Sequence, residues 1–280
     1  MKKIIALAVA SAFVVPAFAA DVAITGSMEN FYQDSNGTTK TEIDGAVVIT
    51  ASSELNNGLT IAADFNISDT IGDDGGNTLK LSGPFGSVDV GDAAGAIDSV
   101  DGIVEFQRIL STGSLGGDAG VTWALPAIGG ASVFVSYVAD SNTQNSAQEP
   151  GNEIAVKYDI AGISLRYGMA DNDDATEETY IGATYSMQGL TVAIENHEDK
   201  AADATTTEKA TVGVKYNTGD LTLAITNRDT KTTASGTTAD VTAYSVEYSL
   251  GGGAAVFYEN SSDSKTATED KQVLGLAYKF

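Results

Sequence analysis

The residue types that usually carry out enzyme chemistry are scarce in this sequence of 280 residues. It contains one histidine, His197, and no cysteine, whereas Asp and Glu together number 38 and Lys and Arg 15. A catalytic nucleophile needs a neighbouring base, and a zinc site needs several histidine or cysteine ligands, so we expect neither. The carboxylates are scattered and form no evident acid–base pair. We therefore predict that the protein is not an enzyme, and we interpret His197 as an ordinary surface residue.

The charge balance narrows the partners further. A formal charge of −23 excludes binding to nucleic acid, because phosphates require clustered Lys and Arg. Strong acidity can accompany disorder, but 42% of the residues are hydrophobic and they recur periodically, which favours a folded chain.

A repeated strand design runs through the second half of the sequence. Five segments alternate apolar with small or polar residues and end in tyrosine, and these tyrosines recur every 27 to 32 residues: Tyr158, Tyr185, Tyr216, Tyr248 and Tyr278. Each of the first four is followed by a short turn, such as Ala161-Gly162, and most of these turns lead into a second alternating strand and a long polar loop. Period-two alternation gives a strand one apolar face and one polar face.

The first half fits the same pattern less clearly, and the whole chain yields sixteen strands. They are predicted near residues 22–32, 42–55, 59–68, 77–83, 87–92, 119–125, 131–139, 153–160, 163–170, 177–187, 190–197, 208–216, 221–229, 240–250, 254–260 and 271–280. An even number suits a bacterial barrel with short periplasmic turns and both termini on the periplasmic side.

The polar strand faces decide between a membrane barrel and a soluble β-sandwich, which also alternates. They carry Lys157, Arg166, Glu195, Lys215 and Glu247. A dry sandwich core could not hold these charges unpaired, whereas a water-filled lumen can. We predict an all-β fold, a transmembrane antiparallel β-barrel with apolar residues outside. The tyrosines then form an aromatic girdle at one rim.

The first residues indicate export. Lys2 and Lys3 precede the apolar run 4–15, and Ala17-Phe18-Ala19 supplies a small-residue cleavage site. The run is shorter than the about 20 residues of a spanning helix. We predict a cleaved signal peptide over 1–19 and a barrel domain over 20–280; an uncleaved anchor is the alternative.

Two motifs and one long connection give the chain a family resemblance. The last strand, Gln272–Phe280, alternates and ends in phenylalanine; Leu79–Gly91 reads close to L-x-G-x-F-G-x-V-x-x-G; and the longest connection, 93–118, follows that hairpin. The chain resembles the general, trimeric Gram-negative outer-membrane porins. The resemblance implies a homotrimer among outer-membrane lipid and lipopolysaccharide that passes small hydrophilic solutes by passive diffusion. It also makes Tyr278 and Phe280 part of an outer-membrane assembly signal.

In such porins the third extracellular loop folds into the barrel and narrows the pore, and by our count 93–118 is that loop. Its apolar residues must pack on something, and the inner wall is available: Ile97, Ile103, Val104, Phe106, Ile109 and Leu110. Its charges are then the candidates for the constriction: Asp98, Asp101, Glu105 and Arg108. Packing at a subunit interface or over the mouth is the alternative. The family often has arginine where this chain has Asp92, so no arginine cluster is carried over.

Phasing each strand by its apolar residues gives the charges of the lumen wall. The acidic ones are Glu29, Asp44, Asp64, Asp89, Glu195, Glu247 and Glu259, and the basic ones are Lys80, Lys157, Arg166, Lys215, Arg228 and Lys279. The wall alone is nearly neutral, and the excess negative charge lies on the loops. Carboxylates at the mouth and the constriction attract cations, which predicts a modest cation preference that salt screens.

Other uses of the acidic loops stay open. Asp73, Asp74, Asp173 and Asp174 offer oxygen ligands for structural Ca²⁺ or Mg²⁺, although solvated acidic loops without a metal ion are commoner. No other cofactor is expected. A substrate-selective porin is one alternative function, and it would need an aromatic slide or a basic ladder in the lumen. A non-conducting barrel that serves as an adhesin or envelope anchor is the other.

Overall fold

The computed structural model describes residues 20–68, 76–110, 119–138, 151–172, 176–233, 238–265 and 270–280. The strands within these residues are β1 (Asp21–Ser35), β2 (Thr38–Glu54), β3 (Thr60–Ser68), β4 (Asn77–Gly83), β5 (Gly86–Ala93), β6 (Ala119–Ala124), β7 (Ala131–Val138), β8 (Gly151–Ile160), β9 (Ile163–Asn172), β10 (Glu177–Met187), β11 (Leu190–Lys200), β12 (Thr206–Thr218), β13 (Leu221–Thr232), β14 (Thr238–Gly251), β15 (Ala254–Asp263) and β16 (Lys271–Lys279). Their bounds lie within a few residues of the predicted ones. The predicted signal peptide, 1–19, lies outside the described residues.

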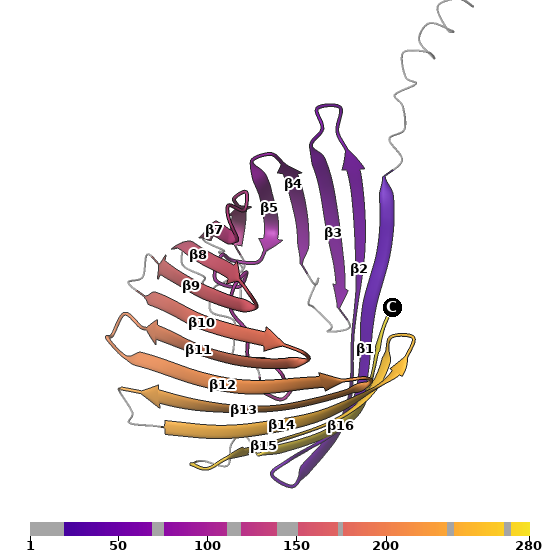
Figure 1. Cartoon of the computed structure of the whole chain (residues 1–280), viewed down its shortest axis with the longest axis vertical. Coiled ribbons are helices and arrows are strands. Elements are labelled where there is room, and N and C mark those ends of the chain that lie inside the picture. Colours follow the sequence, from indigo (N-terminus) through magenta and orange to yellow (C-terminus); the bar gives the residue numbers. More distant parts are fainter. Residues whose placement is uncertain are drawn as a thin grey trace, which may run out of the picture.

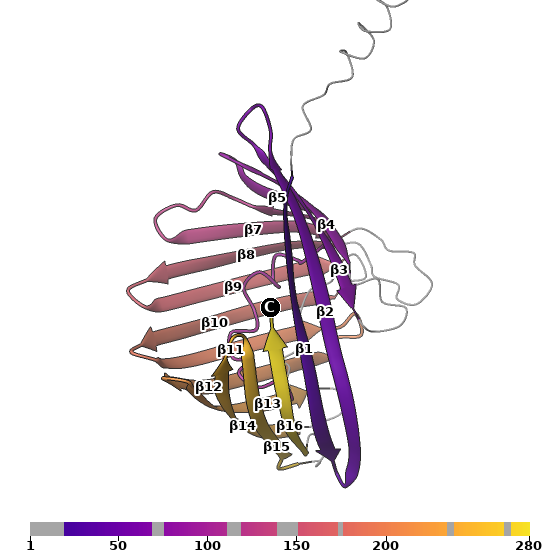
Figure 2. The same cartoon turned by 90° about the vertical axis from the view of Figure 1, so that its right-hand side faces the viewer.

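These strands form one closed antiparallel barrel. Each strand pairs with its neighbours in sequence, and β1 pairs with β16 to close the ring. Figures 1 and 2 show the strands following one another around the wall in chain order. Among the described residues, no helix is long and apolar enough to cross a membrane. The predicted barrel and its strand number are confirmed.

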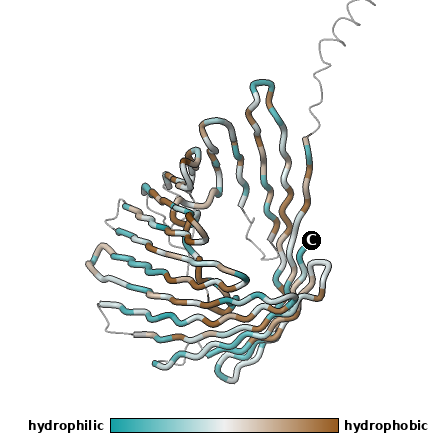
Figure 3. Tube along the Cα trace, viewed as in Figure 1, coloured by the Kyte–Doolittle hydropathy of each residue, from teal (hydrophilic) through white to brown (hydrophobic). Residues whose placement is uncertain are grey.

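The two faces of the wall differ as the alternation predicts. On β10, Ile181 and Tyr185 are exposed on the outer face. Tyr180, which precedes Ile181 on the same strand, points inward and is buried. Figure 3 shows the resulting alternation of hydrophobic and hydrophilic residues along the strands. A sandwich would bury its apolar face, so the exposed apolar exterior excludes that alternative.

One end of the barrel has tight two-residue turns. Between β8 and β9, Ala161 and Gly162 have φ values of 49° and 83°, and Gln188 and Gly189 between β10 and β11 have 48° and 84°. Two successive positive φ values characterise the type I′ turn, whose twist matches that of antiparallel strands. The predicted short turns are therefore present at these positions.

Clusters of buried apolar residues lie inside the ring. After β5 the chain turns inward, and the segment 94–110, here called the inward loop, lies within the barrel (Figure 1). Its side chains Ile97, Val100 and Leu110 are buried against inner-wall residues. This connection joins β5 to β6 and is the third, after β1–β2 and β3–β4, at the end of the barrel opposite the turns just described. The predicted infolding of the third loop is therefore confirmed for 94–110. Residues 111–118 of the predicted loop lie outside the described part.

Candidate pore constriction

Small residues on the inner wall form a seat for the inward loop. A Cβ on Gly168 would lie 3.0 Å from Ile97 Cγ1, and one on Gly182 would lie 2.7 Å from Ile103 Cδ1. Alanines of neighbouring strands complete this seat: Ala155, Ala170, Ala193 and Ala243. Because these positions alternate with outward apolar residues, the strand pattern itself provides the seat. The loop follows the inner wall from β8 towards β14.

Glu153 of β8 anchors the start of the inward loop. Its side chain is buried, and its Oε2 accepts hydrogen bonds from Ser136 Oγ (2.9 Å) and from the backbone N–H of Ile97 (3.2 Å). The N–H of Ala96 in turn donates to Ser136 Oγ at 2.9 Å. Glu153 is not among the residues predicted from the sequence. The alternation of β8 does place this carboxylate on the lumen side. Its partner, the backbone N–H of Ile97, becomes evident only when the path of the loop is known.

Arg108 fastens the end of the loop to three carboxylates of the wall. Its Nε donates to Glu29 Oε1 at 3.0 Å, its Nη2 to Glu247 Oε2 at 2.8 Å, and its Nη1 to Glu259 Oε1 at 3.2 Å. Burial lowers the pKa of Arg108, but the hydrogen bonds to Glu247 and Glu29 and the attraction of the carboxylates outweigh it. The pKa therefore lies above its ordinary value, and the guanidinium stays charged.

The other charged residues predicted for the loop have different surroundings. Asp98 Oδ2 accepts a hydrogen bond from the N–H of Gly95 at 3.2 Å, so this carboxylate also stabilises the loop's own turn. Asp101 is half-buried and Glu105 is exposed. The structure thus gathers the three acids on one loop inside the barrel, while Arg108 lies among carboxylates of the wall.

The predicted wall charges do not form one site. Lys80 Nζ lies 3.0 Å from Asp89 Oδ2, and Lys157 Nζ lies 2.9 Å from Asp159 Oδ2. Two others touch the inward loop: Arg166 donates to the carbonyl of Val100 at 2.8 Å, and Lys215 lies 4.8 Å from the centre of the Phe106 ring. Arg228 lines a hollow of about 390 Å³ beside the loop end, with Glu29, Asp44, Arg108 and Lys271 among its other lining residues.

The interpretation of His197 as a surface residue is wrong. Its side chain is 1% exposed and faces inward, because it follows the phase of Glu195 on β11. Its Nε2 lies 3.7 Å from Glu195 Oε1, and its ring meets Tyr180 edge-on at 4.8 Å. The residue lies near the end of its strand, as expected, but the long strands β10 to β12 carry it within the wall.

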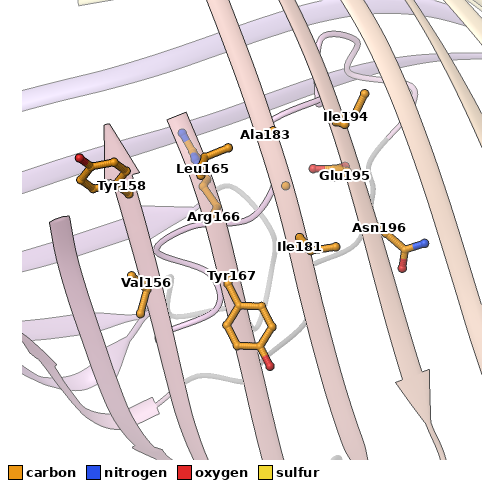
Figure 4. A pocket seen from close by; sticks show the side chains of 11 residues that line it. Val156, Tyr158, Leu165, Arg166, Tyr167, Ile181, Ala183, Ile194, Glu195 and Asn196 are labelled. Atoms are coloured by element: carbon orange, nitrogen blue, oxygen red, sulfur yellow. The ribbon is translucent and has the colours of Figure 1, made fainter. Parts of the chain in front are cut away.

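A second hollow lies on the outer face and has a different character. This groove of about 490 Å³ crosses β8 to β11, and Figure 4 shows its lining, which includes Val156, Tyr158, Leu165, Tyr167, Ile181 and Ile194. Val156 is half-buried, and the other five side chains belong to the exposed apolar exterior, which faces away from the lumen. The groove is therefore separate from the constriction.

The C-terminal residues close the ring. The N–H of Phe280 donates to the carbonyl of Gly26 at 3.0 Å, and the N–H of Gly26 donates back to Phe280 at 2.9 Å. The rings of Tyr278 and Phe280 stack with centres 5.7 Å apart on the exterior. Their predicted role as an assembly signal remains a proposal.

Metal binding has no site within the described segments. No group of three or more His, Cys, Asp or Glu residues there is placed to hold a metal ion. Asp73, Asp74, Asp173 and Asp174, the candidates for Ca²⁺ or Mg²⁺, lie outside the described residues.

The chain is similar in fold to solved porin structures. A porin refined at 1.8 Å resolution matches with a TM-score of 0.78 and 18% identity, over 93% of this chain and 100% of that one. A Salmonella typhi OmpF in complex with daunomycin matches with a TM-score of 0.78 and 15% identity, over 95% and 99%. An anion-selective porin from Comamonas acidovorans matches with a TM-score of 0.72 and 17% identity, over 93% and 100%.

Sequence comparison supplies the family. No curated protein sequence matches the chain. The family model described as Gram-negative porin, however, matches residues 6–268, nearly the whole chain. With its sixteen-stranded barrel and infolded third loop, the chain belongs to the Gram-negative porin family, whose members form channels in the outer membrane.

Proposed function

We propose that this porin is a water-filled channel for passive diffusion of small hydrophilic solutes, with a modest preference for cations. The observation that carries the proposal is the inward loop, which takes up part of the lumen and presents Asp98, Asp101 and Glu105. Carboxylates at a narrow point raise the local concentration of cations and repel anions.

The wall formed by β1 to β5 supports the same sign of selectivity. Its inner face carries Glu29, Asp44, Asp64 and Asp89, and Lys80 is in contact with Asp89. The structural relatives include an anion-selective porin, so the fold itself does not fix the sign. The sign of the selectivity depends on the charged residues that each porin carries in its lumen.

We further propose a homotrimer in which the β4–β5 hairpin contacts a neighbouring subunit. Both strands begin and end within the described residues and have only 7 and 8 residues. A tilted strand needs about 9–11 residues to cross the hydrocarbon core. The outward tyrosines at the short-turn rim stand on β8, β10, β12, β14 and β16, whereas β2 and β4 contain no tyrosine. A hairpin with strands this short and without a rim tyrosine suits a contact with protein better than one with lipid.

Recording from single channels in planar bilayers tests the proposed function. We expect uniform conductance steps and, in a salt gradient, a reversal potential of the sign given by cation preference. No steps at all would defeat the channel, and a reversal potential of anion sign would defeat the charge argument. Saturable block by one solute would instead favour the substrate-selective alternative.

The loop carboxylates can be tested separately. The variant D98N/D101N/E105N should move the reversal potential towards zero, because three negative charges leave the lumen. Since Asp98 also accepts a hydrogen bond from Gly95, D101N/E105N is the cleaner variant. An unchanged reversal potential in both would show that the loop charges do not face the permeating ions.

The first 19 residues are proposed to be a cleaved signal peptide. N-terminal sequencing of protein from isolated outer membranes should begin at Ala20. A start at Met1 would show an uncleaved anchor instead.

A further inference from the structure

We propose that Arg108 is a positioning residue whose ion pairs hold the end of the inward loop against the wall and so keep the pore at one width. The group formed by Arg108, Glu29, Glu247 and Glu259 is here called the latch. This inference rests on the proposed channel function and adds a determinant of the channel's open state.

The latch joins the end of the inward loop to three strands of the wall. Its three carboxylates come from β1, β14 and β15, and the arginine also lies over the ring of Phe257, with Cζ 3.9 Å from the centroid. Beside it, the N–H of Ile109 donates to Glu259 Oε2 at 3.0 Å. Each donor face of the guanidinium therefore has a carboxylate partner, and the aromatic ring covers its plane.

Only a planar, forked cation satisfies this arrangement. Nε, Nη1 and Nη2 each address a different glutamate, in directions that a guanidinium fixes. A lysine at position 108 is a single charged point on a flexible stem and cannot occupy three directions in one plane. The position therefore demands arginine for its geometry as well as its charge.

A buried carboxylate holds each end of the loop, but only the second end also depends on partly exposed ion pairs. The start is held by hydrogen bonds to Glu153, whose carboxylate is buried. At the other end, Arg108 is 32% exposed and Glu29 and Glu247 are 23% and 36% exposed, whereas Glu259 is 0% exposed. Exposed ion pairs compete with water and salt. The latch is consequently the end that can release.

Release would free the loop end from the wall while the start stays in place. The freed segment contains Ile109 and Leu110, which pack against Phe257, Val273 and Val241. A loop that moves between held and released positions gives the channel more than one conductance level, because the open area of the lumen then changes.

The experiment compares Arg108→Ala, Arg108→Lys and Lys80→Ala in planar bilayers. Lys80 is also a wall-facing cation paired with one carboxylate, but no contact joins it to the inward loop in the described structure. All three proteins can be scored for reversal potential and for the number and noise of open levels. We expect R108A, and to a lesser degree R108K, to lose the single uniform level and close at lower voltage. K80A should shift the reversal potential in the direction of stronger cation preference and should show no additional conductance levels.

A second set of variants covers failure of R108A to assemble. That variant leaves Glu259 buried without its countercharge, which is destabilising. R108M/E259Q removes both charges and should show the same added levels in an assembled barrel. Glu247→Gln, at the most exposed carboxylate, should show an intermediate effect. Free guanidinium, which fits the vacated position, should restore the uniform level in R108A more than an equal concentration of potassium does.

Two results would overturn the inference. One is an assembled R108M/E259Q channel whose open level and noise equal those of the wild type. The other is a K80A channel with the same added conductance levels as R108A, because the effect would then come from lumen charge alone. Absence of conductance in the wild-type protein would instead defeat the proposed channel, so the two failures are distinguishable.

Discussion

At the scale of single residues, buried carboxylates hold the inward loop at both ends. Glu153 accepts the N–H of Ile97, and Glu259 accepts the N–H of Ile109. A buried carboxylate without partners is costly, so each glutamate fits only if the loop is in place. Loop position and wall charge are therefore mutually dependent.

Removal of the first anchor should loosen the loop. Glu153→Ala leaves the Ser136 hydroxyl and the backbone N–H of Ile97 without their acceptor, and an unsatisfied buried group costs about 1–3 kcal/mol. We expect a lower temperature of unfolding and noisier single channels. The unfolding temperature is measured by warming samples in steps and recording when the folded form disappears from gels run without further heating. Glu153→Gln, which retains an acceptor oxygen, should fall between wild type and E153A.

The matched control for this prediction is Glu198→Ala. Glu198 is exposed on the outer face of β11, so its removal should leave both measurements unchanged. Equal effects of E153A and E198A would contradict the anchoring role.

These residue roles mark the limit of what the sequence could predict. The apolar character of 94–110 and the lumen phase of Glu259 were readable, because both follow from local pattern. The partners Glu29, Glu247 and Glu259 of Arg108 were not, because they come from strands far apart in sequence. Likewise, His197 was misjudged because its burial depends on the height of neighbouring strands and on the loop.

At the scale of elements, the alternating strands do two things at once. Their outward apolar residues make the exterior, and their inward small residues make room for the loop. In Val212-Gly213-Val214, for example, the valines set the phase, and a Cβ on Gly213 would lie 2.5 Å from Val104 Cγ1. The strands were predictable from the alternation of apolar and polar residues. The seat was not, because small inward-facing residues are compatible with any barrel interior, with or without a loop packed on them.

A methyl group at the seat should displace the loop. Gly213→Ala crowds Val104 and Phe106, and overpacking of this kind costs about 1–3 kcal/mol. Because the loop can yield only towards the lumen, we expect a smaller single-channel conductance and a lower temperature of unfolding.

Gly45→Ala on β2 is the control for this change. A Cβ there would meet nothing closer than Ser27 O at 3.5 Å, an ordinary contact. G45A should therefore behave as wild type. Wild-type conductance and stability in G213A as well would mean that the loop does not rest on this glycine.

At the scale of the whole molecule, the charge of −23 makes selectivity dependent on salt. The Debye length falls from about 30 Å at 0.01 M to about 3 Å at 1 M ionic strength, so mouth and loop carboxylates stop acting on ions in the pore centre. For a constant ratio of salt across the bilayer, the cation-signed reversal potential should shrink as the mean concentration rises. A reversal potential independent of concentration would indicate selection by close contacts instead.

The exterior of the barrel predicts where subunits meet. Leu79 on β4 and Ile181 on β10 are both exposed apolar residues, but β4 belongs to a hairpin too short to cross the membrane alone. Fluid acyl chains adapt to a bulky side chain, whereas a packed protein interface does not. Leu79→Trp should therefore lower the temperature at which trimers dissociate on unheated gels, while Ile181→Trp should leave it unchanged.

Both substitutions add the same apolar volume to the outer face, so they differ only in what covers that face. If I181W dissociates as readily as L79W, the effect is one of barrel folding and the β4–β5 hairpin has no special role. If only L79W dissociates and its monomers still conduct, each barrel carries its own pore and the trimer serves stability. That result is the one expected here, because the loop, its seat and the latch all lie within a single chain.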